Sequence, residues 1–218
     1  YQIAVTRDAN QHIIGFSGTA KGYPTAASRI GQYNDGGVAF GPENVLLVTR
    51  YPNNQLEESK PGSTTPSKVI DLGPLGVTSS VGSLAVVPRI YNTAGTIKLV
   101  SFPSGDWYDV ALAPDGNGTF DISRASLRAN VGAGAEGIAF VPPGSPAFPS
   151  NSALIAKYTT NSIVTASLDS NGDPIPGSSQ TFMQLIPGPE GAAIDPVTGD
   201  FLVSTSANDD KVIVVRGF

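Results

Sequence analysis

One unit of sequence recurs five times along the 218-residue chain. Each unit has a short apolar run, a turn rich in Asn, Gly or Asp, and a second apolar or alternating run. The five units occupy residues 2–17, 44–59, 96–112, 153–168 and 200–217. Apolar runs on either side of such a turn are typical of β-hairpins. Because the hairpins recur at a spacing of roughly fifty residues, the chain is predicted to form similar sheets placed side by side, as in a β-propeller.

A second, shorter repeat precedes four of the five hairpins. It has Gly, then small and β-branched residues, then a Pro turn, at residues 36–43, 82–89, 136–143 and 190–197. Strands crowd together near the axis of a propeller, where small side chains are needed. We therefore expect these segments to form the innermost strands. The residues expected to face between blades are Val45, Leu47, Ile97, Leu99, Leu154, Ala156, Phe201 and Val203.

The repeats run from one end of the chain to the other, which predicts a single all-β domain over residues 1–218. We expect a five-bladed propeller with blades at about 1–34, 36–78, 81–129, 135–186 and 190–218. A six-bladed ring, or a four-bladed ring with an extra N-terminal hairpin, remains an alternative. The first blade would lack its inner strand, and its exposed edge would need covering. Residues upstream of Tyr1, the C-terminal strands or another chain could cover it, and the last case predicts a homo-oligomer.

Composition and charge exclude several classes of function. The net charge is -5 and the 13 basic residues are scattered singly, which argues against binding of nucleic acid. No apolar stretch has the length of a transmembrane helix. The chain has no cysteine and one histidine, His12, which excludes disulfides and multi-histidine metal sites and argues against a Ser-His-Asp triad.

Three carboxylates stand at equivalent positions, where the chain enters a predicted inner strand: Asp35, Glu136 and Glu190. In a propeller these positions converge on the axis, so the carboxylates would repel one another unless a cation lies among them. Ca²⁺ or Mg²⁺ would suit such oxygen ligands, although no cofactor is required by the pattern. Alternatively, each carboxylate caps the N–H groups of its own Gly turn, or pairs with Arg7 or Arg50.

The hairpin turns supply a second set of candidates, for ligand binding. In an antiparallel meander the turn after the second strand lies at the same end as the entrance to the inner strand. Aromatic side chains at such a mouth can stack on sugars or flat ligands, and they can equally well fill the space between blades. The candidates are Arg7, Asn10, Arg50, Asn54, Trp107, Tyr158, Asn161 and Asn208.

The segment DSNGDP offers an alternative metal site. Asp169, Asn171 and Asp173 alternate as in the first half of many calcium loops. No carboxylate follows at the position of the twelfth-residue ligand. An Asx-rich hairpin turn explains the same residues.

Several stretches resemble a known family. They are residues 36–77, GDWYDVALAPDGNGTFDI (105–122), EGIAFVPPGSP (136–146), DSNGDPI (169–175) and, above all, GPEGAAIDPVTGDFLVST (188–205) with the closing VIVVRGF. Together they are similar to the propeller ectodomains of bacterial exported proteins that carry a PEP-CTERM sorting tail. The resemblance covers nearly the whole chain. It implies export to the cell envelope or the extracellular matrix, and no established enzyme activity.

A more distant resemblance links the Glu-Gly entrances at Glu136 and Glu190 to gluconolactonase-type and NHL-type propellers. It implies an axial divalent cation that activates a hydrolytic water, with an entrance Glu as one ligand. The lactonase type has six blades, against five hairpins in this chain. The sequence thus supports two hypotheses. The first is a non-enzymatic binding or structural module for a polysaccharide, a matrix protein or a copy of itself, and the second is a cation-dependent hydrolase of lactones or esters.

Overall fold

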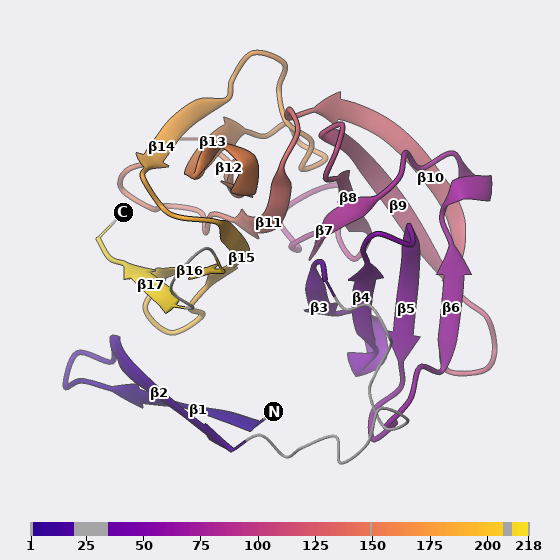
Figure 1. Ribbon diagram of the computed structural model, residues 1–218, viewed down its shortest axis with the longest axis horizontal. Helices are drawn as coiled ribbons and strands as arrows, with labels where there is room; N and C mark the ends of the chain where they lie inside the picture. Colours follow the sequence, from indigo (N-terminus) through magenta and orange to yellow (C-terminus); the bar gives the residue numbers. More distant parts are fainter. Residues whose placement is uncertain (1, 20–34, 149, 207–210, 218) are drawn as a thin grey trace.

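The computed structural model describes residues 2–19, 35–148, 150–206 and 211–217. Within these residues, antiparallel strands form four sheets of three or four strands and one separate two-stranded hairpin. The four sheets lie side by side in an arc, each with its first strand toward the centre (Figure 1). This arrangement is that of a β-propeller, so the all-β, propeller class predicted from the repeats is confirmed.

Each sheet is a simple meander whose strands follow the order of the chain. The first sheet consists of β3 (Val38–Phe40), β4 (Leu46–Arg50), β5 (Gln55–Ser59) and β6 (Lys68–Asp71). The second consists of β7 (Val81–Val86), β8 (Ile97–Ser101), β9 (Asp106–Pro114) and β10 (Phe120–Asn130). The third consists of β11 (Ala135–Phe140), β12 (Ser152–Lys157), β13 (Ser162–Ser167) and β14 (Gln180–Gln184). The fourth consists of β15 (Pro189–Ile194), β16 (Phe201–Thr205) and β17 (Lys211–Val215).

Outside these sheets lie the hairpin, β1 (Gln2–Arg7) and β2 (Ile13–Thr19), and three single turns of 3₁₀ helix. The turns are η2 (Pro42–Asn44), η3 (Gly73–Leu75) and η4 (Tyr158–Thr160). Both η2 and η4 join the strands of a hairpin, between β3 and β4 and between β12 and β13. They therefore belong to the rims of the propeller.

The inner strands are β3, β7, β11 and β15, as the Gly-containing repeat predicts. Their small residues are required by close approach of neighbouring inner strands. A Cβ atom on Gly137 would lie 2.2 Å from the carbonyl oxygen of Glu190 and 2.6 Å from the amide nitrogen of Ala192. One on Gly37 would lie 2.3 Å from the amide nitrogen of Leu84. Real Cβ atoms do not come so close to backbone, so only Gly fits where these strands meet.

The hydrophobic core is divided into three clusters, one between each pair of neighbouring sheets. Middle strands bury both faces: Leu154 belongs to the cluster with the fourth sheet, and the next residue, Ile155, to the cluster with the second. Such strands read as continuous apolar runs because neither face meets water. The eight residues expected to face between blades are all at most 1% exposed, so that prediction is confirmed.

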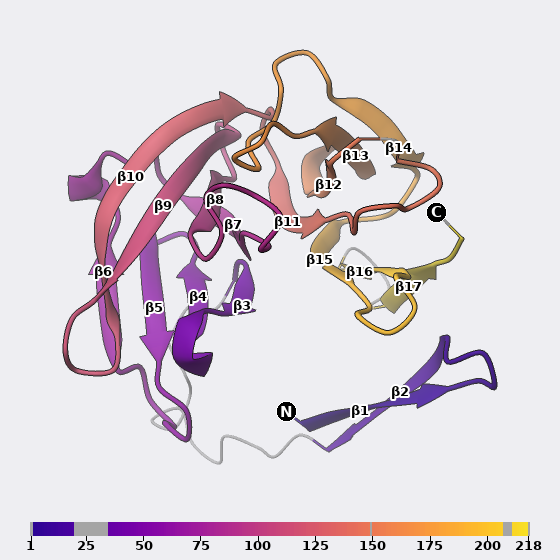
Figure 2. The same ribbon diagram turned by 180° about the vertical axis from the view of Figure 1, so that it is seen from behind.

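Within the part of the chain that the structure describes, the N-terminal hairpin forms no complete blade. It lies beside the fourth sheet, next to β17, as Figure 2 shows from behind. Arg7 forms a two-pronged ion pair with Asp195, at 2.6 and 2.9 Å, and the His12 ring nitrogen lies 2.7 Å from Asp200. The guanidinium of Arg216 donates to the carbonyl oxygen of Ile13. Among the described residues, side chains rather than strand pairing thus attach the hairpin to the last sheet.

The described residues therefore give four blades and a hairpin, which corrects the expectation of five blades and corresponds to the alternative of four blades with an extra N-terminal hairpin. A five-bladed count followed from treating each hairpin unit of the sequence as one sheet. The first unit, however, pairs only within itself among the described residues. The additional strand expected near 28–33 lies outside the described residues.

Candidate functional site

The inner strands open at one end of the axis, which we call the axial mouth, defined by Asp35, Gly82, Glu136 and Glu190. Asp35 pairs with Tyr51 just before β3, and Glu136 and Glu190 stand near the starts of β11 and β15. A Cβ on Gly82 would lie 3.1 Å from a carboxylate oxygen of Glu136. The repeat thus places three carboxylates around one opening, as expected from their equivalent positions.

Below the mouth lies a cavity of about 340 Å³, lined by the inner strands and also by β16, β17 and β2. Its walls are glycine backbone and apolar side chains from all four sheets and from Phe16 of the hairpin. Among the described residues that line it, Glu136 is the ionisable side chain, and Ser204 supplies a hydroxyl. A mostly apolar cavity with a few polar groups is typical of a site for small molecules or for a protruding group of a larger partner.

Glu136 has the most strongly perturbed carboxyl group at this opening. Its partial burial raises the pKa of the carboxyl to about 8, and the negative charges of Asp35 and Glu190 act in the same direction. At neutral pH the carboxyl of Glu136 therefore keeps its proton in most molecules. Burial and like charge together disfavour a third negative charge at the mouth, on Glu136.

Two of the expected arrangements for the three carboxylates are not found. Arg7 binds Asp195 at the opposite end of β15, and Arg50 lies beside Glu57 and Gln55, so neither arginine pairs with the mouth. Within the described part of the chain, no backbone N–H group caps the carboxylate of Asp35, Glu136 or Glu190. No group of three or more Asp, Glu or His side chains among the described residues has the spacing of a metal site.

Three aromatic rings form an arc at the same end of the blades. Tyr51, Phe102 and Tyr158 each follow the second strand of one of three successive sheets. The ring of Phe102 lies edge-on to that of Tyr51, with centroids 5.4 Å apart, and to that of Tyr158, at 6.3 Å. Phe102 borders the carboxylates, because its Cβ lies 2.9 Å from the position of a Cβ on Gly82. Sequence analysis selected Tyr158 and missed Phe102, although the repeat places an aromatic residue at each of these three turns.

The other turn residues expected to bind a ligand have different surroundings. Arg7 and Asn10 lie at the opposite end of the propeller, because Arg7 contacts Asp195 after β15. Asn54 is 7% exposed, and its amide bonds the backbone of Val77 and Val81. Asn161 is exposed and accepts a hydrogen bond from the N–H of Gly188. Asn208 lies outside the described residues.

Trp107 is not at the mouth, which corrects its proposed role as a surface ligand residue. It is fully buried, and its indole N–H donates to Asp173 at 3.1 Å. The turn after β8 ends before Trp107, which already belongs to β9 and points toward the third sheet. A tryptophan between blades contributes packing area, and its N–H then needs a buried acceptor.

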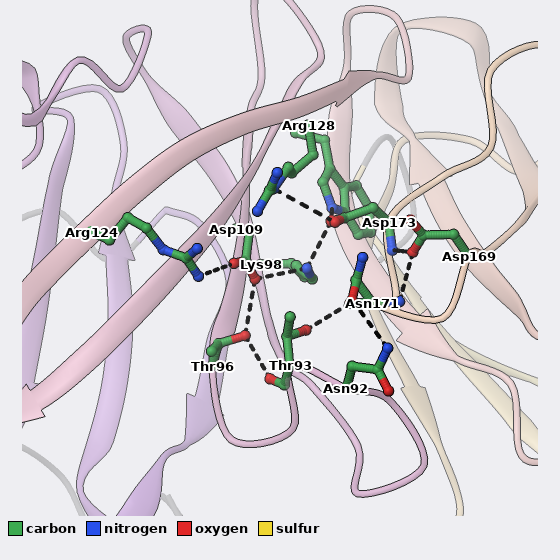
Figure 3. Close-up of polar contacts among 11 residues, drawn as sticks. Asn92, Thr93, Thr96, Lys98, Asp109, Arg124, Arg128, Asp169, Asn171 and Asp173 are labelled. Atoms are coloured by element: carbon green, nitrogen blue, oxygen red, sulfur yellow. Dashed lines mark hydrogen bonds and ion pairs between the residues drawn. The ribbon is translucent and has the colours of Figure 1, made fainter.

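The segment DSNGDP forms a tight turn that docks on the second sheet (Figure 3). The ammonium of Lys98, fully buried, lies 2.7 Å from Asp173 and 2.8 Å from Asp109. Asp169 accepts the N–H groups of Asn171 and Asp173 within the turn. The structure thus supports the Asx-turn interpretation of these residues, with a lysine ammonium against the carboxylate of Asp173.

Comparisons with known proteins agree on the fold. A glucose dehydrogenase superposes with a TM-score of 0.57 at 14% sequence identity, over 96% of this chain and 67% of its own. An auxiliary nutrient binding protein from Bacteroides thetaiotaomicron gives 0.50 at 12% identity, over 83% and 48%. A protein assigned as a gluconolactonase gives 0.49 at 16% identity, over 83% and 59%. Identities this low show a shared fold alone, and the chain spans about half to two thirds of the length of these structures.

Neither the protein-family models nor the curated proteins contain a match to this sequence. In the described residues, no helix is long and apolar enough to span a membrane. The fold and the site together define the chain as an all-β protein of propeller arrangement with a small cavity at one end of its axis.

Proposed function

We propose that this chain is an exported module of the bacterial cell envelope or extracellular matrix, which binds a partner at the axial mouth without changing it chemically. The partner classes that we consider are a polysaccharide, a matrix protein or a second copy of the chain. Export rests on the resemblance of residues 136–146 and 188–205 to the propeller domains of PEP-CTERM proteins.

The observation that carries the proposal is the cavity under the mouth. Its described lining offers a shaped apolar wall, one carboxyl group and one hydroxyl, which is sufficient to orient and hold a group of the partner. The aromatic arc beside it adds flat surface on which a sugar ring or a side chain can stack. The apolar wall, the polar groups and the aromatic rings together are sufficient for a binding site.

Co-sedimentation with the insoluble matrix of a PEP-CTERM-bearing bacterium tests the proposal. We expect the wild-type protein to sediment with the matrix and the double variant Glu136→Gln/Tyr158→Ala to stay in the supernatant. Mass spectrometry of the recovered matrix should show no new cleavage products. Equal sedimentation of the wild type and the double variant would refute binding at the mouth.

A cation-dependent hydrolase of lactones or esters is the second candidate, and one observation favours it. A carboxyl group with a pKa near 8 can donate a proton at neutral pH, as a general acid does. Turnover of a panel of aliphatic lactones in Ca²⁺ or Mg²⁺, abolished in Glu136→Gln, would place this function ahead of simple binding. Absence of turnover together with matrix binding would favour the first candidate.

A further inference from the structure

The axial cavity combines two properties that together select a class of ligand. Its described walls are apolar, from residues such as Leu84, Ile138 and Leu202, while Glu136 projects a carboxyl group at its mouth. Asp35 and Glu190 lie close enough to act electrostatically on that carboxyl. An occupant therefore meets negative charge at one end and hydrocarbon at the other.

A hard metal ion fits this lining poorly. Ca²⁺ takes six to eight oxygen ligands and Mg²⁺ six, in near-octahedral geometry. The described lining offers side-chain oxygens from Glu136 and Ser204, and the hydroxyl of Ser204 already accepts the N–H of Gly191. A cation that carries its own apolar surface needs no such set of ligands, because contact with the walls replaces its hydration.

The aromatic arc of Tyr51, Phe102 and Tyr158 adds a preference among organic cations. Aromatic rings attract alkylated ammonium groups through their negative faces, most strongly where water is partly excluded. The arc borders the carboxylates, and Tyr158 is 37% exposed, so a ligand can reach it. We propose that the axial mouth binds an alkylated ammonium group, with its charge against Glu136 and its apolar part in the cavity. This inference rests on the proposed binding function and names the group that is recognised.

Binding of such a group displaces the proton of Glu136 into solvent, so affinity should rise with pH. Among the described residues, the charged side chains around the mouth are those of Asp35, Glu136, Glu190 and Lys157, which lies on the strand next to β11, and the arc adds the phenol groups of Tyr51 and Tyr158. The ammonium of Lys157 donates to the carbonyl oxygens of Val131 and Gly132, and burial lowers its pKa to about 8. Loss of the proton from Lys157 would also strengthen binding of the ammonium ligand as the pH rises through about 8. A variant at Glu136 is therefore needed to separate the effect of Glu136 from that of Lys157.

Isothermal titration calorimetry with choline tests the inference, because the charge of choline does not change with pH. The control ligand is the neutral alcohol in which carbon replaces the quaternary nitrogen. We expect choline to bind at least about tenfold more tightly than this alcohol at pH 9, and about tenfold more weakly at pH 6 than at pH 9. Glu136→Gln should remove most of both differences, and Tyr158→Leu should weaken choline alone. Glu43→Gln, an exposed carboxylate on η2, is the matched control and should behave as wild type.

Equal affinity for choline and the alcohol, or no binding of choline by the wild type, would overturn the inference. So would binding of Ca²⁺ that is lost in Glu136→Gln and competes with choline, since it would make the mouth a metal site. If the protein sedimented with the matrix but did not bind choline, this inference would be wrong and the proposed function would stand. If it neither sedimented with the matrix nor bound choline, the proposed function would be wrong as well.

Discussion

Replacing Glu136 by Gln should change how the stability of the protein depends on pH. In the unfolded chain this carboxyl ionises near its ordinary pKa of 4.5, whereas in the folded protein it holds its proton to about 8. The folded state thus binds more protons between these values, and stability is lost as the pH rises from 4.5 through 8. At about 1.4 kcal/mol for each pH unit, the ceiling of this loss is about 5 kcal/mol. Because Glu136 is partly accessible to water, we expect about 2–3 kcal/mol.

Urea unfolding followed by circular dichroism at pH 5 and pH 8.5 measures the effect. The free energy of unfolding of Glu136→Gln relative to wild type should rise by about 2–3 kcal/mol between the two conditions, because glutamine cannot ionise. Glu43→Gln, at an exposed position, should follow the wild type at both. If the curves of wild type and Glu136→Gln ran parallel within about 0.5 kcal/mol, Glu136 would not be in the environment that we describe.

Three further predictions concern the blades, each measured as the free energy of unfolding in denaturant. Leu47→Ala should cost about 2–5 kcal/mol, because the side chain is fully buried between two sheets, while Leu127→Ala, at 58% exposure, should stay within about 0.5 kcal/mol. Gly137→Ala should cost about 1–3 kcal/mol, because the new Cβ would meet the backbone of β15, whereas Gly73→Ala has a nearest contact at 3.5 Å and should change little. Lys98→Met should cost about 3–5 kcal/mol, because it removes the buried cation between Asp109 and Asp173 and leaves them with the partly exposed guanidinium groups of Arg124 and Arg128. A cost under 1 kcal/mol in any of the three buried positions would contradict the packing that we describe.

Much of the fold could be predicted because small and large apolar residues recur at equivalent positions of the repeat. Inner strands need small residues because they crowd near the axis. Middle strands need apolar pairs, such as Leu154 and Ile155, because both of their faces pack against a neighbouring sheet. The three carboxylates of the mouth could be located for the same reason, since equivalent positions in a repeat converge on one axis. The chain therefore encodes its blades and the entrance of its cavity locally.

What could not be predicted depends on contacts between distant residues. The place of the N-terminal hairpin is set by the pairs Arg7–Asp195 and His12–Asp200, and no spacing in the sequence encodes them. The burial of Trp107 follows from the face of β9 that it occupies, and a shift of one residue would have turned it outward. A signal was available here: Lys98 interrupts an apolar strand, and a charge at such a position indicates a buried partner.

The attachment of the hairpin also bears on the order in which the molecule assembles. Each blade contacts its neighbours in the chain, but the contacts from Arg7 and His12 join residues that are 188 positions apart. Closing so long a loop has an entropic cost that only the finished blades can offset, so this contact forms after them. We also expect the hairpin to detach at a lower free energy than the stacked sheets separate, because side chains such as Arg7 and His12 hold it to the last sheet. The N-terminal hairpin is therefore expected to dock on the last sheet late in folding and to leave it before the blades unfold.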